Sequence, residues 1–82
     1  MVNVKYRGAL AELTGKPRET INALNVKGVL RYIESTYGKA PLKAAKTMLI
    51  TVNGESIVLL KSYNTLLAEG DELAFYPICG GG

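Results

Sequence analysis

The chain of 82 residues contains no histidine and only one cysteine. Without histidine it lacks the side chain that most often serves as a general base near neutral pH. A single cysteine cannot form an internal disulfide, and without histidine it forms neither the common zinc sites nor a Cys–His nucleophile pair. We therefore expect no bound metal and no active site of its own, and we interpret the chain as a substrate, a carrier or a binding module.

Long apolar runs and clustered charges are also missing. No stretch approaches the length of a transmembrane helix, and no signal-peptide pattern opens the chain. The net charge of +3 arises from lysines and arginines that are scattered between Lys5 and Lys61. We therefore predict a cytoplasmic protein that binds neither membrane nor nucleic acid. No glycine-rich loop precedes a helix, so no phosphate-binding loop and no bound cofactor are expected.

An ordinary globular composition, with 48% apolar and 21% charged residues, predicts one small domain. Residues 2–7 alternate between apolar and polar side chains, which is typical of a half-buried strand. Residues 9–13 predict a short helical turn that ends at Gly15. A weaker strand is expected around residues 20–21.

The segment from Asn25 to Gly38 predicts the one long helix. Asn25 is a suitable N-cap, and Gly38 suits a left-handed residue at the C-terminal end. We expect Pro41 to prevent the helix from resuming, and residues 41–47 to form a polar connection. The apolar stripe that would pack on a sheet comprises Val26, Val29, Leu30, Ile33 and Tyr37.

The C-terminal half predicts three further strands. Residues 48–52 alternate, and Asn53-Gly54 then favours a tight hairpin turn because both residue types tolerate positive φ. Residues 56–59 are the expected returning strand. After a turn at residues 69–71, the last strand is expected to point Leu73 and Phe75 inward and Ala74 and Tyr76 outward.

The predicted class is therefore α+β, with the helix packed on one face of the sheet. On the opposite face, Leu49 and Tyr76 are expected to point outward. If their strands are neighbours, the two side chains form an exposed apolar patch beside the C-terminus. Otherwise they are isolated surface residues, which are normal on globular proteins.

The chain closes on Cys79 followed by Gly80, Gly81 and Gly82. Glycine loses the most backbone entropy on ordering, so neither a helix nor a strand gains from this run. One explanation is a frayed terminus. The other is that a partner draws the terminal carboxylate into a slot too narrow for side chains.

The remaining motifs favour the second explanation. "VNGE" at residues 52–55, "LLAEGDELAFYP" at residues 66–77 and a terminal Gly-Gly together resemble the ubiquitin-like sulfur-carrier family. The chain is most similar to the small subunit of molybdopterin synthase, with the thiamine-pathway sulfur carrier more distant. The similarity runs essentially end to end and includes the "LAELTGK" segment at residues 10–16.

The resemblance implies a β-grasp roll, with a mixed sheet of four to five strands and one main helix on one face. It also implies that the first and last strands lie side by side and parallel in mid-sheet. Residues 1–77 would form the β-grasp domain, and residues 78–82 would form a flexible tail.

The resemblance further implies a chemistry for the tail. An adenylating enzyme of the ubiquitin-activating type would use ATP to convert the terminal carboxylate of Gly82 to an acyl-adenylate, with Gly81 as its required neighbour. Sulfur from a persulfide would then leave a thiocarboxylate, and the tail would enter a partner such as the large subunit of molybdopterin synthase. Gly80 belongs to this tail, and Phe75, Tyr76 and Pro77 match the stretch that leads it toward the partner, beside Leu49.

The chain departs from the family pattern at Ile78, where a second proline is common, at Cys79, and in having three terminal glycines. These differences leave other roles open, namely attachment to lysines of other proteins or sulfur donation to transfer RNA. Cys79 could accept sulfur during transfer. Because no cationic residue or helix start is near it in sequence, we interpret it instead as a small tail residue with an ordinary thiol.

Overall fold

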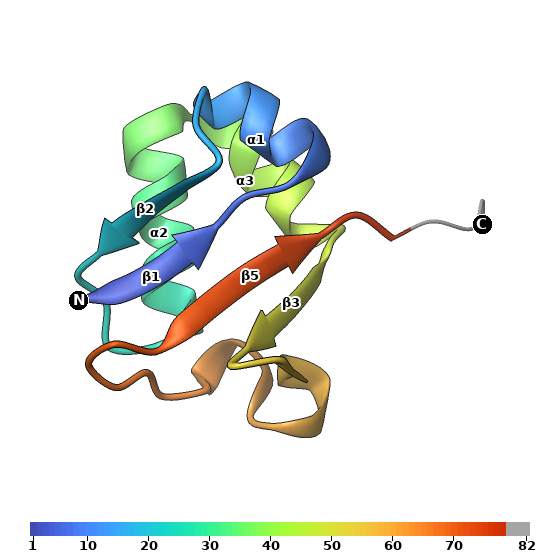
Figure 1. Ribbon diagram of the computed structural model, residues 1–82. Coiled ribbons are helices and arrows are strands. Elements are labelled where there is room, and N and C mark those ends of the chain that lie inside the picture. Colours follow the sequence, from blue (N-terminus) through green and yellow to red (C-terminus); the bar gives the residue numbers. More distant parts are fainter. Residues whose placement is uncertain (79–82) are drawn as a thin grey trace.

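Val2, Val4 and Tyr6 are buried on one side of the first strand, as their alternation predicts. The structure is a computed structural model that describes residues 1–78, and it places three helices on one face of a five-stranded sheet (Figure 1). In chain order the elements are β1 (Val2–Lys5), α1 (Gly8–Thr14), β2 (Arg18–Ile21), α2 (Val26–Tyr37), α3 (Lys39–Lys46), β3 (Leu49–Val52), β4 (Glu55–Ser56), the 3-10 turns η1 (Ile57–Leu59) and η2 (Ser62–Asn64), and β5 (Glu72–Tyr76).

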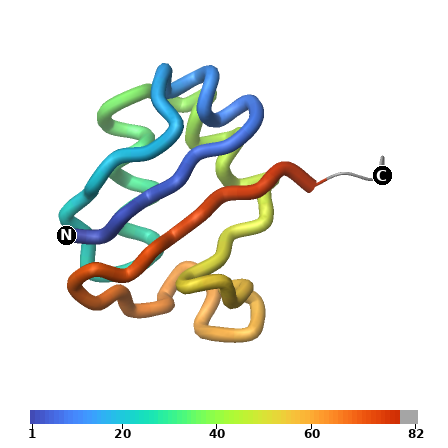
Figure 2. The backbone as a smooth tube through the Cα atoms, in the orientation of Figure 1, coloured from blue at the N-terminus to red at the C-terminus, as the bar shows by residue number. Residues whose placement is uncertain are grey.

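The first and last strands lie side by side at the centre of the sheet, whose order is β2-β1-β5-β3-β4 (Figures 1 and 2). β1 and β5 are parallel, with Val4 opposite Leu73. The other neighbouring strands are antiparallel. The α+β class and the parallel central pair are thus confirmed.

The predicted long helix is α2, and its start is fixed by a side-chain cap. The Asn25 Oδ1 atom accepts a hydrogen bond from the Gly28 N–H at 2.8 Å. This bond satisfies one of the amides that have no partner in the first helical turn. The predicted stripe faces the sheet, where Leu73 and Phe75 are fully buried. Four stripe residues are buried, Val26, Val29, Leu30 and Ile33, and Tyr37 packs against them.

The prediction that residues 41–47 form a polar connection is wrong, because this segment belongs to α3. Pro41 lies in the first turn of α3, where a backbone N–H would have no helical partner and its absence costs nothing. Gly38, with φ of 107°, separates α2 from α3 and lets the chain change direction there. α3 adds the fully buried Ala45 to the core.

The hairpin at Asn53-Gly54 is confirmed, but its returning strand is shorter than predicted. Both turn residues have positive φ, 51° and 86°, and join β3 to β4. The strand ends at Ser56, whose Oγ accepts a hydrogen bond from the Val58 N–H and starts η1. Only Ile57 in that turn is buried, so a 3-10 turn suffices to deliver it to the core.

The two sequence motifs "VNGE" and "GDELAF" meet in the structure. The Asn53 side chain donates to Asp71 at 3.1 Å, and its Oδ1 accepts from the Glu72 N–H at 2.9 Å. The Ala68 N–H and the Asn53 amide lower the pKa of the Asp71 carboxyl. These residues therefore tie the β3–β4 turn to the start of β5, and their role is structural.

The Glu19 carboxylate on β2 accepts hydrogen bonds from three tyrosine hydroxyls at the edge of the core. Tyr6 and Tyr37 donate to its Oε2 at 2.6 and 2.7 Å, and Tyr32 donates to its Oε1 at 3.1 Å. Burial raises the pKa of Glu19, but the three tyrosine hydrogen bonds outweigh burial and lower the pKa overall. The carboxylate thereby joins β1, β2 and α2, and the Tyr6 ring also stacks on Phe75 at 6.1 Å.

A pH-dependent stability follows from the lowered pKa of Glu19. A carboxyl whose pKa is lower in the folded state stabilises the fold above its unfolded pKa of about 4.3, and this contribution fades as pH falls through the folded pKa. Glu19→Gln should reduce the free energy of unfolding at pH 7 by about 1–3 kcal/mol and flatten its fall as the pH drops below the unfolded pKa. Denaturant titration at several pH values measures both effects. The exposed Glu12→Gln is the control, and an unchanged pH profile in Glu19→Gln would contradict the assignment.

Candidate functional site: the corner where the tail leaves the sheet

The chain leaves the sheet at the end of β5, away from the N-terminus (Figure 2). At this corner Tyr76 lies opposite Leu49 on the neighbouring strand β3. The two side chains are 37% and 41% exposed on the face that carries no helices. The two predicted outward residues thus form one apolar patch, which we call the exit patch.

The structure separates the other predicted residues of this stretch. Phe75 is fully buried in the core, so it holds β5 in place and cannot itself touch a partner. Ala74 lies on the outer face as predicted, yet it is buried, because its methyl group sits between Lys5 and Thr51 in the strand register. Pro77 and Ile78 are exposed beyond the strand. Cys79, Gly80, Gly81 and Gly82 lie outside the described residues, so the predictions about them stay predictions.

Sequence reasoning missed two residues that contact the end of β5, namely Arg7 in the β1–α1 connection and Gly8 at the start of α1. The Arg7 guanidinium carbon lies 5.6 Å from the centre of the Tyr76 ring, a cation–π distance. Gly8 has φ of 57° and lies so close to Pro77 that an added Cβ would be 2.9 Å from the proline Cγ. The only local signal was a glycine after a strand, because the contact partner is remote in sequence.

Ile78, which is 68% exposed, stands between two shallow hollows. One, of about 370 Å³, is lined by Ala9, Ala44, Thr47, Met48, Pro77 and Ile78. The other, of about 300 Å³, includes Leu49, Ile57 and Tyr63 in its lining. A partner that grips this corner would find an apolar ridge with a recess on each side, which suits protein–protein contact.

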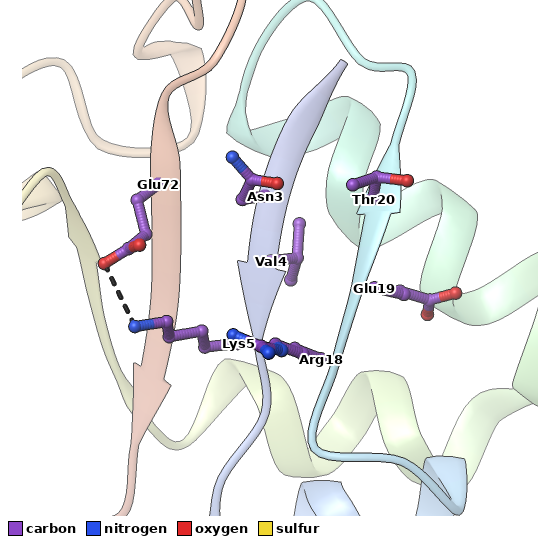
Figure 3. A pocket seen from close by; sticks show the side chains of 7 residues that line it. All are labelled: Asn3, Val4, Lys5, Arg18, Glu19, Thr20 and Glu72. Carbon is purple, nitrogen blue, oxygen red and sulfur yellow. Dashed lines mark ion pairs between the residues drawn. The ribbon is translucent and has the colours of Figure 1, made fainter.

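Another hollow, of about 520 Å³, lies over β2, β1 and β5 and is lined mainly by polar residues (Figure 3). Lys5 pairs there with Glu72 at 3.3 Å, and Asn3, Arg18 and Thr20 add polar groups. The Glu19 carboxylate is turned away from this hollow toward the tyrosines. The hollow therefore offers hydrogen-bonding groups to a partner but no arrangement of base and nucleophile.

Within residues 1–78, no cluster of three or more histidine, cysteine, aspartate or glutamate side chains could hold a metal ion. Nor is any helix of this part of the chain long and apolar enough to cross a bilayer. The distinctive site of the described chain is thus a docking corner that continues directly into the C-terminal residues.

A parallel central strand pair, helices on one sheet face and an exposed corner at the last strand define a ubiquitin-like protein of the β-grasp fold. The sequence matches the model of the ThiS family over residues 4–82, and the chain belongs to that family of ubiquitin-like sulfur carriers. No curated protein matches the sequence significantly.

Solved structures agree on the fold. A chain in the Amycolatopsis orientalis BexX/CysO complex superposes with a TM-score of 0.85 at 19% identity, covering 100% of both chains. Small archaeal modifier protein 1 (SAMP1) from Methanosarcina acetivorans gives 0.84 at 27% identity, covering 99% of this chain and 95% of that one. A chain in the complex of subunits 1 and 2 of molybdopterin-converting factor from Helicobacter pylori superposes with a TM-score of 0.68 at 23% identity. The match covers 98% of this chain and 97% of that one.

The exit patch can be tested with substitutions that leave the core intact. Tyr76→Ala or Leu49→Asp should weaken binding to a cognate partner by about 1–3 kcal/mol, because central apolar contacts dominate such interfaces. Both side chains point outward, so the melting temperature should change little. Calorimetric titration measures the affinity.

The matched control is Leu24→Asp, which changes an exposed leucine on the connection from β2 to α2, at the opposite end of the sheet. It should bind as the unmodified chain does. Equal affinity of all three variants would place the interface elsewhere on the molecule.

Proposed function

We propose that this chain is a sulfur carrier whose Gly82 carboxylate is converted to a thiocarboxylate, and that it serves as the small subunit of a molybdopterin synthase. The observation that carries the proposal is the family match, which extends through the terminal glycines to residue 82. The exit patch supports it, because it places an exposed apolar surface immediately before those residues.

The chemistry explains why the chain needs a partner. A carboxylate is a poor acyl donor, since its charge repels nucleophiles and its oxygen is a poor leaving group. On the proposed route an adenylating enzyme joins the Gly82 carboxylate oxygen to the α-phosphate of ATP and releases pyrophosphate. A persulfide then attacks the acyl carbon, AMP leaves, and a thiol cleaves the S–S bond to free the thiocarboxylate.

The chain's own residues supply docking and reach in this scheme. It contains no histidine, and its one carboxylate held by three tyrosines is committed to the fold. Glycines at positions 80–82 suit a narrow channel because they carry no Cβ. The base, the nucleotide site and the persulfide would all come from partner enzymes.

The large subunit of a molybdopterin synthase is the proposed final partner. The Helicobacter pylori neighbour was solved as a complex of subunits 1 and 2 of molybdopterin-converting factor, which favours a partner of this kind. On this route, the thiocarboxylate sulfur of the bound tail would attack a cyclic pterin precursor held by the large subunit.

A second candidate function is attachment to lysines of other proteins through Gly82. The observation that favours it is the 27% identity to SAMP1, which is described as a modifier. Both functions require activation of the same carboxylate and differ in the acceptor. Sulfur donation to transfer RNA would use the same thiocarboxylate with a different final acceptor.

Removing Gly81 and Gly82 tests what both functions share. The truncated chain should keep its melting temperature, because the buried core lies within residues 2–75 and glycine has no side chain to pack. It should no longer be adenylated by the cognate activating enzyme. Release of pyrophosphate measures activation, and differential scanning fluorimetry measures stability.

An extension by one alanine after Gly82 is a second variant that blocks the route while keeping every native residue. Its activation should also fall sharply, since the carboxylate is displaced from the reacting position. Normal activation of the truncated chain would contradict both the carrier and the modifier functions.

A further inference from the structure

Arg7 in the β1–α1 connection and Gly8 at the start of α1 meet the end of β5 at two consecutive positions. Arg7 places its guanidinium over the Tyr76 ring at 5.6 Å, and Gly8 presents its backbone to the ring of Pro77. The two contacts involve the last residue of β5 and the first residue beyond it. Arg7 and Gly8 thus contact the chain at the point where it leaves β5 and is no longer held by the sheet.

Two features of position 8 require glycine, namely its positive φ and its close approach to Pro77. Its φ of 57° lies in the left-handed region that side chains with a Cβ seldom adopt. A Cβ at this position would also approach the Pro77 Cγ to 2.9 Å and the Pro77 Cβ to 3.7 Å. A Cβ essentially never lies 2.9 Å from a carbon to which it is not bonded. Because the proline ring is stiff, Pro77 would have to move.

The surface against which Pro77 rests is itself firmly held. Tyr6, which precedes Arg7, is buried, donates to Glu19 at 2.6 Å and stacks on Phe75 at 6.1 Å. The Tyr6 N–H also donates to the Pro17 carbonyl at 2.8 Å. The end of β1 is therefore fixed on both its backbone and its side chain, and the Arg7–Gly8 corner cannot yield easily.

We infer that Arg7 and Gly8 are positioning residues that aim the tail. The corner holds Tyr76 and Pro77, and thereby sets the point from which the chain beyond them starts toward the active site of a partner. This inference rests on the proposed function. The rate of reaction at a tethered carboxylate depends on how often the tether presents it in the reacting geometry, so a misdirected exit should slow the chemical step more than it weakens docking.

The test compares two glycine substitutions at opposite ends of α1. Gly8→Ala adds a Cβ against Pro77, whereas Gly15→Ala adds one at φ of 77° with no atom within 4 Å. Both strain the backbone and should lower the melting temperature, Gly8→Ala at least as much as Gly15→Ala because it also displaces Pro77. With the cognate activating enzyme, ATP and a saturating series of carrier, Gly8→Ala should reduce kcat for adenylation by about tenfold at nearly constant KM, and Gly15→Ala should change neither constant.

Pro77→Ala removes the Cγ and Cδ atoms that face Gly8, without straining the backbone of the corner. On this background Gly8→Ala should cost little further activity, because the added Cβ now meets no Cγ. Such a non-additive pair is the expected signature of a direct contact. The amide resonance of Ile78 in a ¹⁵N–¹H spectrum should move in Gly8→Ala and stay in place in Gly15→Ala.

The outcomes separate the inference from the function on which it rests. An unmodified chain that no activating enzyme adenylates would refute the proposed function. If the unmodified chain is active, two results would overturn the positioning role. One is an equal kcat for Gly8→Ala and Gly15→Ala, and the other is a Gly8→Ala variant in which only KM changes. If Gly8→Ala fails to fold, Pro77→Ala decides alone: a lowered kcat at unchanged melting temperature supports the role, and an unchanged kcat overturns it.

Discussion

The parallel pairing of β1 with β5 is the constraint on which the rest of the structure depends. It joins the two ends of the described chain in mid-sheet, with Val4 opposite Leu73 and both fully buried beneath the helices. Because parallel strands end at the same edge of a sheet, the residues after β1 must meet the residues after β5. The contact of Arg7 and Gly8 with Tyr76 and Pro77 is therefore a consequence of topology, and local side chains refine it.

The remaining interactions have two roles. Some stabilise the sheet and its helices, and others leave the exit patch exposed. On the helix side, Glu19 gathers tyrosine hydroxyls from β1 and α2, and the Asn53 side chain secures the start of β5. On the other side, the exit patch and Ile78 stay exposed. On the proposed function, in which partners carry out adenylation and sulfur transfer, the chain would need little more than a rigid body, a docking surface and a reactive end. The described residues supply the first two.

Much of the fold could be predicted from the sequence where periodicity and local chemistry agree, as in β1, the Asn25-capped α2 and the Asn53-Gly54 turn. α3 is not predicted because proline usually ends a helix, although Pro41 lies in the first helical turn, which tolerates it. The strand order came only from family resemblance, since pairing across the chain leaves no local pattern. At the site, Leu49 and Tyr76 were predictable from alternation. The contact of Gly8 with Pro77 was not, because it depends on the folded approach of two distant segments.

We expect Gly82 to become a thiocarboxylate, and intact-mass spectrometry of the protein recovered from its native host would detect this product. Replacement of one carboxylate oxygen by sulfur adds about 16 Da, and treatment with a thiol-alkylating reagent should then label the C-terminal peptide even in a Cys79→Ser chain, so that the cysteine cannot account for the label. Both this mass and this label are expected. Peptides branched at lysine through Gly82, with no trace of thiocarboxylate in the free chain, would contradict it and establish the modifier function instead.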